Sequence, residues 1–243
     1  MRAVLLFILV LVGGSATPFA TAWNWDTHPA IAESAYYRLD DSLREKLSLD
    51  LIKEGSIMPD KVFHDFTKHG FPRALPEAER WLRSTREFLN KQQYDNASLS
   101  FGIASHYITD SFAAPHSISG EPYPLHQLYE KQAAQNYFYA ECTSESFELG
   151  DVLYTGSQQG KTWGEWTDTR DAQLPQLAVR DATFYLTGIA METFNSTCRS
   201  FATHFETPER HLDISHMAFA LAVLACLLFT ILSLYRDLKN NRE

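Results

Sequence analysis

The sequence predicts an all-α protein, a helical bundle that carries metal-binding side chains into one cleft. Three observations favour this fold class. Apolar residues recur at helical spacing in several segments, strand signals are sparse, and two histidines are each followed four residues later by an acid. The 243-residue chain has no internal repeat and no P-loop, G-x-G-x-x-G or G-x-S-x-G motif, so none of the sites built on those motifs is expected.

The first 22 residues have the pattern of a signal peptide. Arg2 supplies a positive charge, an apolar core follows, and a small-x-small sequence ends at Ala22. This apolar run is too short to span a membrane comfortably, so a cleaved leader over residues 1–22 is favoured over an N-terminal anchor. Cleavage after Ala22 would make Trp23 the N-terminal residue of the mature protein.

The other end of the chain is expected to cross a membrane. Residues 216–235 contain a run of 19 uncharged residues, which is long enough for a hydrocarbon layer of ~30 Å. The short tail, residues 236–243, contains three basic residues, and the positive-inside rule places it in the cytoplasm. We therefore expect a single-pass membrane protein with one domain, residues 23–215, on the extracellular or lumenal side.

The charge of the chain makes nucleic acid a less favoured partner. The chain carries −9, and since residues 1–22 and 216–243 each contribute one positive charge, the domain between them carries −11. A field of that sign does not attract polyanions, although bound metal cations would change it locally.

Two of the three cysteines lie in the predicted exported domain. A disulfide between Cys142 and Cys198 is reasonable in an oxidising compartment, although the sequence does not show that the two are close. Cys226 lies in the apolar run. Asn96 and Asn195 begin N-x-S/T motifs, which are glycosylation acceptors if the host glycosylates exported proteins.

Three helical segments are expected in the first hundred residues. One begins near Pro29 with Asp26 or Thr27 as its cap, a second covers residues 40–56, and a third covers residues 76–93. Between the second and the third, a segment bounded by prolines contains four polar candidates: Asp60, His64, Asp65 and His69.

The remaining segments are predicted as follows. Residues 97–113 and 125–140 should form two helices, the first of which ends before Pro115. Residues 141–169 are rich in glycine and less regular, which indicates a long surface excursion rather than a second domain. Residues 170–203 should be helical, in one piece or in two around a proline, and the core candidates there are Leu177, Phe184, Leu186, Ile189 and Phe194.

The stretch from His106 to Glu130 carries the main functional signal. His106 and Asp110 are four residues apart, as are His126 and Glu130, so each pair shares one helix face. His116 follows a proline between the two pairs. Imidazoles and carboxylates without thiolates are the ligand chemistry of a catalytic zinc site. One such pair alone is usually a surface pair or a satisfied core group, so the interpretation depends on ligands elsewhere.

Further candidate ligands precede this stretch. The free amine and carbonyl oxygen of an N-terminal Trp23 could chelate a metal ion, and His28, Asp60 and His69 add two imidazoles and a carboxylate. Nine ligand residues are too many for one zinc ion and suit a cluster. The complete set is Trp23, His28, Asp60, His69, His106, Asp110, His116, His126 and Glu130.

This set resembles the superfamily of zinc-dependent phospholipase C and the single-strand-specific zinc nucleases of fungi and plants. The resemblance rests on H-x3-D-x5-H from His106, H-x3-E from His126, the tryptophan after the signal peptide, and the dipeptide Pro59-Asp60. It covers residues 23 to about 130 by motif. It implies an all-α fold that holds three zinc ions in a cleft.

The resemblance also implies a role for each residue. One zinc ion would be held by Asp60, His69, His106 and Asp110. Asp110 would bridge to a second zinc ion held by Trp23 and His28, and the third would be held by His116, His126 and Glu130. Asp60 is the catalytic candidate, because it would orient or deprotonate the attacking water. The interval from Asp60 to His69 is shorter than is usual in the family, so His64 or Asp65 could replace His69.

Three functions follow from these expectations. A membrane-anchored phospholipase C acting on phospholipids is favoured by the acidic domain and by the anchor. It is also favoured by Glu130, because the resemblance to the nucleases would imply an aspartate at this position. A single-strand nuclease or 3′-nucleotidase is the alternative, supported by the Trp-x4-His spacing from Trp23 to His28. A non-enzymatic zinc-binding protein is the third, and it is disfavoured by the density of ligands that leave open positions.

Overall fold

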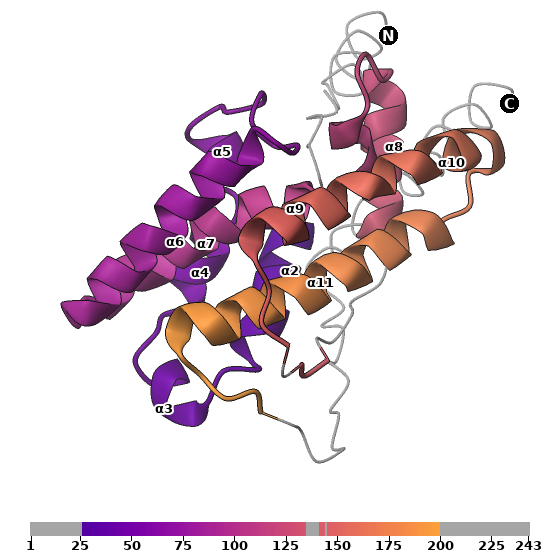
Figure 1. Ribbon diagram of the computed structural model, residues 1–243. Coiled ribbons are helices and arrows are strands. Elements are labelled where there is room, and N and C mark those ends of the chain that lie inside the picture. The colour runs from indigo at the N-terminus through magenta and orange to yellow at the C-terminus, as the bar shows by residue number, and fades with distance from the viewer. Residues whose placement is uncertain (1–25, 135–140, 144, 200–243) are drawn as a thin grey trace, which may run out of the picture. The chain divides into compact units, whose positions relative to one another are not determined.

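We describe residues 26–134, 141–143 and 145–199 of a computed structural model of the chain (Figure 1). These residues contain helices and no strand, so the all-α prediction is confirmed. In chain order the helical elements are α2 (Thr27–Tyr36), α3 (Asp41–Arg44), α4 (Leu49–Gly55), α5 (Met58–Lys61), α6 (Ala74–Asn90), α7 (Tyr94–Asp110), η1 (Ala114–Ser117), α8 (Tyr123–Ala133), α9 (Leu149–Ser157), η2 (Gln158–Thr162), α10 (Trp163–Thr169) and α11 (Gln173–Phe194).

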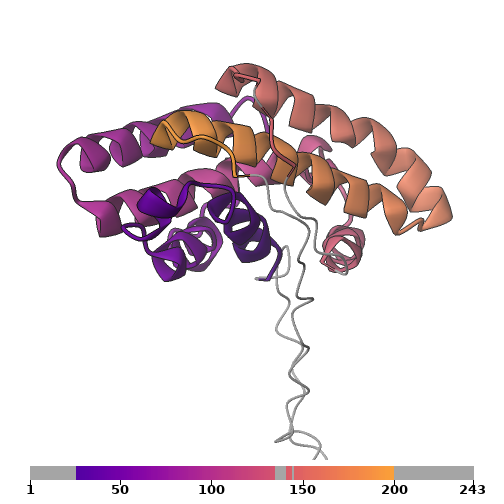
Figure 2. The ribbon, with the colours of Figure 1, turned by 90° about the horizontal axis from the view of Figure 1, so that it is seen from below.

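Helix α7 is the element around which the others pack. It contacts α2, α4, α5, α6, α9 and α11, and almost every residue of its second half is buried. Small residues allow this close packing. A Cβ on Gly102 would lie 2.2 Å from the carbonyl oxygen of Ile52, so glycine is what lets α4 approach the α7 backbone. Figure 2 shows α6 and α7 side by side, and α11 running along the row formed by α9 and α10.

The first half of the chain differs from the prediction in one respect. Residues 40–56 form two short helices, α3 and α4, rather than one. Each has its own capping side chain: Asp40 accepts a hydrogen bond from the amide of Leu43, and Ser48 accepts one from the amide of Leu51. A serine or aspartate that caps a helix in this way ends the preceding one, because its own backbone is extended.

The predicted surface excursion over residues 141–169 is wrong. Its described part contains α9, η2 and α10, and both tryptophans of α10 are buried. Trp163 and Trp166 pack with Tyr129 of α8, and Nε1 of Trp166 donates a hydrogen bond of 2.8 Å to Oε1 of Gln132. The segment therefore belongs to the core. Gly156 packs closely against Phe112, which follows α7. The glycine therefore serves a close contact between packed segments, whereas the glycine-rich pattern had suggested a loop.

Helix α11 is one continuous helix that includes Pro175. The proline lies in the first turn, where no backbone hydrogen bond is lost, so it does not divide the helix. Three of the core candidates, Leu186, Ile189 and Phe194, are buried as predicted. Phe184 is only partly buried, and Leu177 is 41% exposed, so it is not part of the core.

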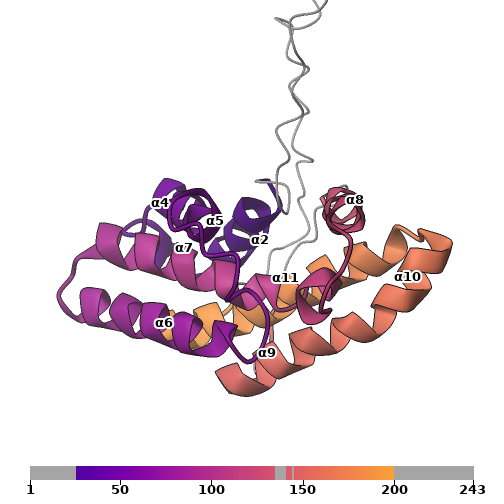
Figure 3. The same ribbon diagram turned by 90° about the horizontal axis from the view of Figure 1, so that it is seen from above.

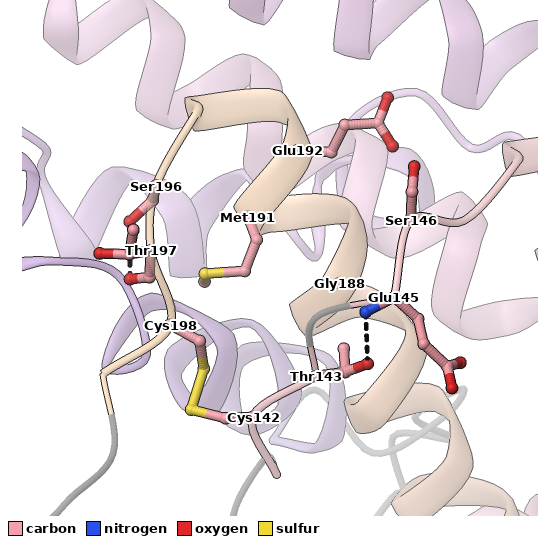
Figure 4. A pocket seen from close by; sticks show the side chains of 10 residues that line it. All are labelled: Cys142, Thr143, Glu145, Ser146, Gly188, Met191, Glu192, Ser196, Thr197 and Cys198. Carbon is pink, nitrogen blue, oxygen red and sulfur yellow. Dashed lines mark hydrogen bonds between the residues drawn. A yellow bond between two sulfur atoms is a disulfide. The ribbon is translucent and has the colours of Figure 1, made fainter.

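The predicted disulfide is present. Cys142 and Cys198 are bonded, with their Cα atoms 5.6 Å apart. Both cysteines line a surface pocket of about 670 Å³ together with residues near the end of α11, including Met191 and Glu192 (Figure 4). Next to it, the amide of Arg199 donates to the carbonyl oxygen of Arg38, so the chain after α11 is fastened to the end of α2.

Both predicted membrane-related segments, residues 1–22 and residues 216–243, lie outside the described residues. Within the described residues, no helix has both the length and the apolar character needed to cross a bilayer.

Candidate metal centre

Helix α7 presents two candidate ligands from one face. His106 and Asp110 are one turn apart, and Nε2 of His106 lies 3.3 Å from Oδ2 of Asp110. The other ring nitrogen of His106 is 2.8 Å from the carbonyl oxygen of Ser56, which follows α4. Because a carbonyl oxygen only accepts, Nδ1 carries the hydrogen in the neutral ring, and Nε2 keeps its lone pair for a metal ion.

His28 of α2 approaches Asp110 from the opposite side. Its Nε2 lies 3.1 Å from Oδ1 of Asp110, and its Nδ1 lies 2.8 Å from the hydroxyl oxygen of Thr109. The Thr109 hydroxyl donates its own hydrogen to the carbonyl oxygen of His106, so it accepts the hydrogen of the neutral His28 ring. The lone pair of His28 Nε2 is therefore also directed at the centre.

Asp60 and His69 come from α5 and from the loop that follows it. Nε2 of His69 is 3.3 Å from Oδ1 of Asp60, and Nδ1 of His69 is 2.9 Å from Oδ2 of Asp110. Gly70, next to His69, lets the loop lie directly against η1. A Cβ there would lie 2.4 Å from the carbonyl oxygen of His116, so any larger residue would push the loop away from η1.

The last three candidates come from η1 and α8. Nε2 of His116 is 3.5 Å from Oδ1 of Asp110 and 3.7 Å from Oε1 of Glu130, so it lies between the two carboxylates. His126 and Glu130 are one turn apart in α8, and Nε2 of His126 is 2.6 Å from Oε1 of Glu130. Nδ1 of His126 lies 3.0 Å from Oε1 of Glu121, a residue that the sequence did not single out.

Asp110 is the centre of the arrangement. Its carboxylate is 99% buried and lies within 3.5 Å of ring nitrogens from α2, the loop after α5, α7 and η1. One carboxylate therefore joins side chains from four separate parts of the chain. Eight of the nine candidates are brought together at this centre, and Figure 3 shows α2, α5 and α8, which carry four of them, on the same side of α7.

A family comparison agrees with this geometry. A model of the family described as zinc dependent phospholipase C matches residues 27–179, which contain all eight described candidates. The chain belongs to this family. The resemblance inferred from the motif is thereby confirmed, and membership places the chain among zinc-dependent hydrolases.

A solved structure has a similar fold. The crystal structure of Clostridium perfringens alpha-toxin, isolated from avian strain SWCP, superposes with a TM-score of 0.53 and 14% identity, covering 72% of this chain and 65% of that chain. At this identity the likeness concerns the fold alone, a domain built of helices. The chain spans 65% of the length of the toxin structure. A comparison with curated proteins gives no match.

The residues present fit the zinc that the family requires. Several buried atoms that face the centre have no hydrogen-bond partner, among them Oδ1 of Asp60, Nε2 of His69, Nε2 of His106 and Oδ1 of Asp110. Buried polar atoms are rarely left unpaired, and a cation would satisfy all four. The donor atoms form four overlapping triads, and within each triad the three donor atoms lie within 4.8 Å of one another. The triads are His28–His106–Asp110, Asp60–His69–His106, His69–Asp110–His116 and His116–His126–Glu130.

Burial and neighbouring charges shift the pKa values of the carboxyl groups in different directions. Burial raises the pKa of Asp60, and raises that of Glu130 to about 7 against the opposing effect of His126. Burial acts in the same direction on Asp110, but the imidazoles around it outweigh burial and hold its pKa well below its usual range. Asp110 is therefore a permanent negative charge at the centre of the site.

Two histidines have pKa values raised to about 9, namely His69 and His126. Burial alone would lower both, but Asp110 and Asp60 beside His69, and Glu130 and Glu121 beside His126, have the larger effect. Without metal, these two rings hold protons that balance the carboxylates. A bound cation would take over that balancing role.

Two predicted alternatives are not brought to the centre. His64 is exposed, and Asp65 accepts a hydrogen bond of 3.1 Å from the hydroxyl of Tyr107, so of the three histidine and aspartate candidates in this loop it is His69 that reaches the site. Trp23 lies outside the described residues.

Sequence reasoning missed the groups that orient the imidazoles, which are Thr109, the carbonyl of Ser56 and Glu121. Thr109 could have been noticed, because it precedes Asp110 on the same buried turn. Glu121 lies five residues before His126, which is not one of the helical spacings of three or four residues that bring side chains together. Helix α8 begins after Pro122, so Glu121 lies before the helix and His126 lies within it. Backbone carbonyls leave no signal in a sequence.

Proposed function

We propose that this chain is a membrane-anchored phospholipase C that uses zinc to hydrolyse the phosphodiester of phospholipids. The observation that carries the proposal is the position of Asp110 in a chain of the zinc-dependent phospholipase C family. Oδ1 of Asp110 lies close to ring nitrogens of His28 and His116, and Oδ2 lies close to those of His69 and His106. A carboxylate that bridges two cations has each oxygen directed at a different set of ligands in this way.

The proposed cluster contains three zinc ions. The first would be held by Asp60, His69, His106 and Asp110, the second by Trp23, His28 and Asp110, and the third by His116, His126 and Glu130. Two of the four triads of neighbouring donor atoms match the first and the third site, and the other two triads both contain Asp110, the proposed bridging carboxylate. The Trp23 ligand rests on cleavage after Ala22. Bound zinc supplies Lewis acidity, which favours hydroxide at neutral pH and offsets negative charge on a phosphodiester.

Asp60 is the proposed catalytic base. It is 8% exposed and lies at the edge of the cluster, and burial raises the pKa of its carboxyl group, which is the direction expected for a proton acceptor near neutral pH. In the proposed step Asp60 takes one proton from a water molecule as its oxygen bonds to phosphorus. The bond from phosphorus to the glycerol oxygen breaks, and that oxygen takes a proton from solvent water, to which Asp60 gives up the proton it accepted. Thr109 and Glu121 keep the rings of His28 and His126 in their orientation.

Phospholipid is favoured over nucleic acid as the substrate for two reasons. The chain carries −9, which repels a polyanion, and the acid in the third site is a glutamate. A single-strand nuclease or 3′-nucleotidase remains the second candidate on the Trp-x4-His spacing. The proposed anchor is the apolar run in residues 216–235, with the catalytic domain extracellular or lumenal.

The test uses the purified full chain, its metal content, and two substrates. We expect close to three zinc ions per chain, release of phosphocholine from phosphatidylcholine, and little cleavage of single-stranded DNA. Removal of the metal by a chelator should abolish hydrolysis, and zinc should restore it. Cleavage of DNA with no action on phospholipid would replace the proposal with the nuclease, and zinc without either activity would indicate the non-enzymatic alternative. Extraction of the chain from membranes by detergent but not by alkaline carbonate would support the anchor.

A further inference from the structure

Four large apolar side chains are exposed to solvent on the loop that carries His69 and on the helix that carries His126. Val62 is 53% exposed, Phe63 40%, Phe66 63% and Tyr123 53%. We call these four residues the apolar rim. Three of them fall within five consecutive residues of the loop between α5 and α6. Exposed apolar groups gathered in this way usually mark a surface that contacts something else.

The loop that carries the rim is held in place by hydrogen bonds. The amide of Phe63 donates to the carbonyl oxygen of Met58, and the amide of Asp65 donates to that of Pro59. Between them His64 has φ = 51°, in the left-handed region that a residue other than glycine enters at a cost. Phe66 is the more exposed of the two phenylalanines, while the ring of Phe63 stacks on that of Trp81 in α6, 6.0 Å away, and stays 40% exposed.

The rim is continuous with the row of imidazoles. The ring of Phe66 lies 6.5 Å from that of His69, which is 5.2 Å from His116, which is 4.8 Å from His126, which is 6.2 Å from Tyr123. Phe66 thus lies beside one candidate ligand and Tyr123 beside another, with His116 between those two ligands. A partner that contacts both aromatic residues would therefore lie near the metal centre.

The charge of this loop differs from that of the whole chain. Residues 61–73 contain three basic residues and one acid within a chain that carries −9. Lys68 is paired with Asp65 and Glu77, so its charge is balanced locally, whereas Arg73 is exposed. The loop therefore lacks the strong negative charge of the whole chain, and its exposed aromatic side chains suit a surface with phosphate groups above an apolar layer.

We propose that the apolar rim enters the interfacial layer of a phospholipid bilayer, so that the row of imidazoles faces the lipid phosphates. The inference rests on the proposed phospholipase C function. Aromatic side chains favour the boundary between head groups and acyl chains, and the proposed anchor in residues 216–235 would hold the domain at the same bilayer. Bases of single-stranded nucleic acid also stack on aromatic rings, but the net charge of −9 opposes that partner.

The first measurement does not depend on turnover. Amide hydrogen exchange of the full chain with its metals is followed by mass spectrometry at short times, with and without phosphatidylcholine vesicles. We expect slower exchange in residues 62–66 and 121–125 when vesicles are present. The double variant Phe63→Ser/Phe66→Ser should lose this protection. The matched control is Tyr37→Ser/Leu177→Ser, which removes two side chains that are 40% and 41% exposed elsewhere, and it should keep the protection.

The second measurement compares turnover on phosphatidylcholine vesicles with turnover on a short-chain phosphatidylcholine dissolved as monomers. In Phe63→Ser/Phe66→Ser the ratio of the two rates should fall about tenfold or more, because two large apolar groups no longer leave water at the bilayer. In the control variant the ratio should stay within about twofold.

The outcomes separate this inference from the proposed function. An unchanged ratio, or equal losses on both substrates, would overturn membrane docking while leaving the phospholipase C activity intact. Loss of single-stranded DNA cleavage in the phenylalanine variant would assign the rim to nucleic acid instead. If the wild-type chain hydrolyses no phospholipid, the proposed function fails, and the exchange measurement alone decides whether the rim docks. Unchanged exchange in the presence of vesicles would overturn it.

Discussion

The two halves of the described chain do different work. The half from α2 to α8 contains all eight described candidate ligands, and it is built of short elements and loops around the two 17-residue helices α6 and α7. The half from α9 to α11 contributes no side chain to the four donor triads, and it is built of packed aromatic and aliphatic residues. A ligand site needs many chain segments to meet at one point, whereas its support needs continuous helices. Removing a ligand should therefore affect zinc and turnover, and removing a packed side chain should affect stability.

The largest expected effect is that of Asp110→Ala in the first half. This change removes the carboxylate shared by four imidazoles, and at least one zinc ion should dissociate because two cations would lose the negative charge between them. Turnover should fall by roughly 10³-fold or more, as for loss of a metal. Metal analysis and phosphodiester hydrolysis provide the measurement. Full activity in this variant would contradict the proposed zinc cluster.

The matching change in the second half is Trp166→Ala. Trp166 is fully buried against Tyr129 and Trp163, so the change should lower the free energy of unfolding by about 3 to 5 kcal/mol. Zinc per folded chain should stay the same, because α10 supplies no ligand. Denaturant unfolding and metal analysis check this, with Leu177→Ala as an exposed control expected to change stability little. Loss of zinc from the folded variant would show that the two halves are not separable.

Within the first half, Asp60→Asn should separate chemistry from binding. The amide can still offer an oxygen to a metal ion, but it accepts no proton. We expect most of the zinc to remain while turnover falls by ~10²-fold, as for loss of a general base. Single-turnover kinetics and metal content should be measured on the same preparation. Unchanged turnover would remove Asp60 from the role of base.

The pH dependence of zinc binding should follow His69 and His126. Their pKa values in the metal-free protein are raised from 6.5 to about 9, so zinc must displace a proton from each near neutrality, and its affinity should fall about tenfold per proton for each unit of acidification. The metal-free fold has the opposite dependence: the protonated rings add stability that is complete below pH 6.5 and is lost as the pH rises through 9. Chelator competition between pH 7 and 8 is the measurement, and an affinity independent of pH would contradict it.

The smallest expected effect is that of Glu121→Ala. Its carboxylate holds Nδ1 of His126 but does not reach the centre, so zinc affinity should fall about tenfold with the total stoichiometry intact. Glu121→Gln should restore much of the affinity, because an amide oxygen still accepts the hydrogen of Nδ1. If both variants bind zinc like the wild type, Glu121 has no orienting role.

The same comparison explains what could be predicted from the sequence. The candidate ligands could be named because zinc chemistry restricts residue type, and because His106 with Asp110 and His126 with Glu130 repeat the helical spacing. The choice of His69 over His64 needed the structure, since both lie in one loop and only the backbone turn at His64 decides which ring points inward.

The second half was predicted poorly for the opposite reason. Packed segments use glycine for close contacts as well as for loops, so the glycines of residues 141–169 gave a misleading signal at Gly156. Phe63 and Phe66 illustrate a different limit: both are large and apolar yet exposed, and apolar composition alone cannot indicate a surface that contacts a partner.

The disulfide has a mechanical consequence. Cys198 lies four residues beyond the end of α11, and it is bonded to Cys142, while Arg199 is paired with Arg38. Tension applied to the chain after Arg199 would therefore pass through a covalent bond before it could unwind α11 from its end. If the segment beyond tethers the domain to a bilayer, shear on that bilayer would be carried first by this cross-link and by the hydrogen bond to Arg38, and not by the last turns of α11.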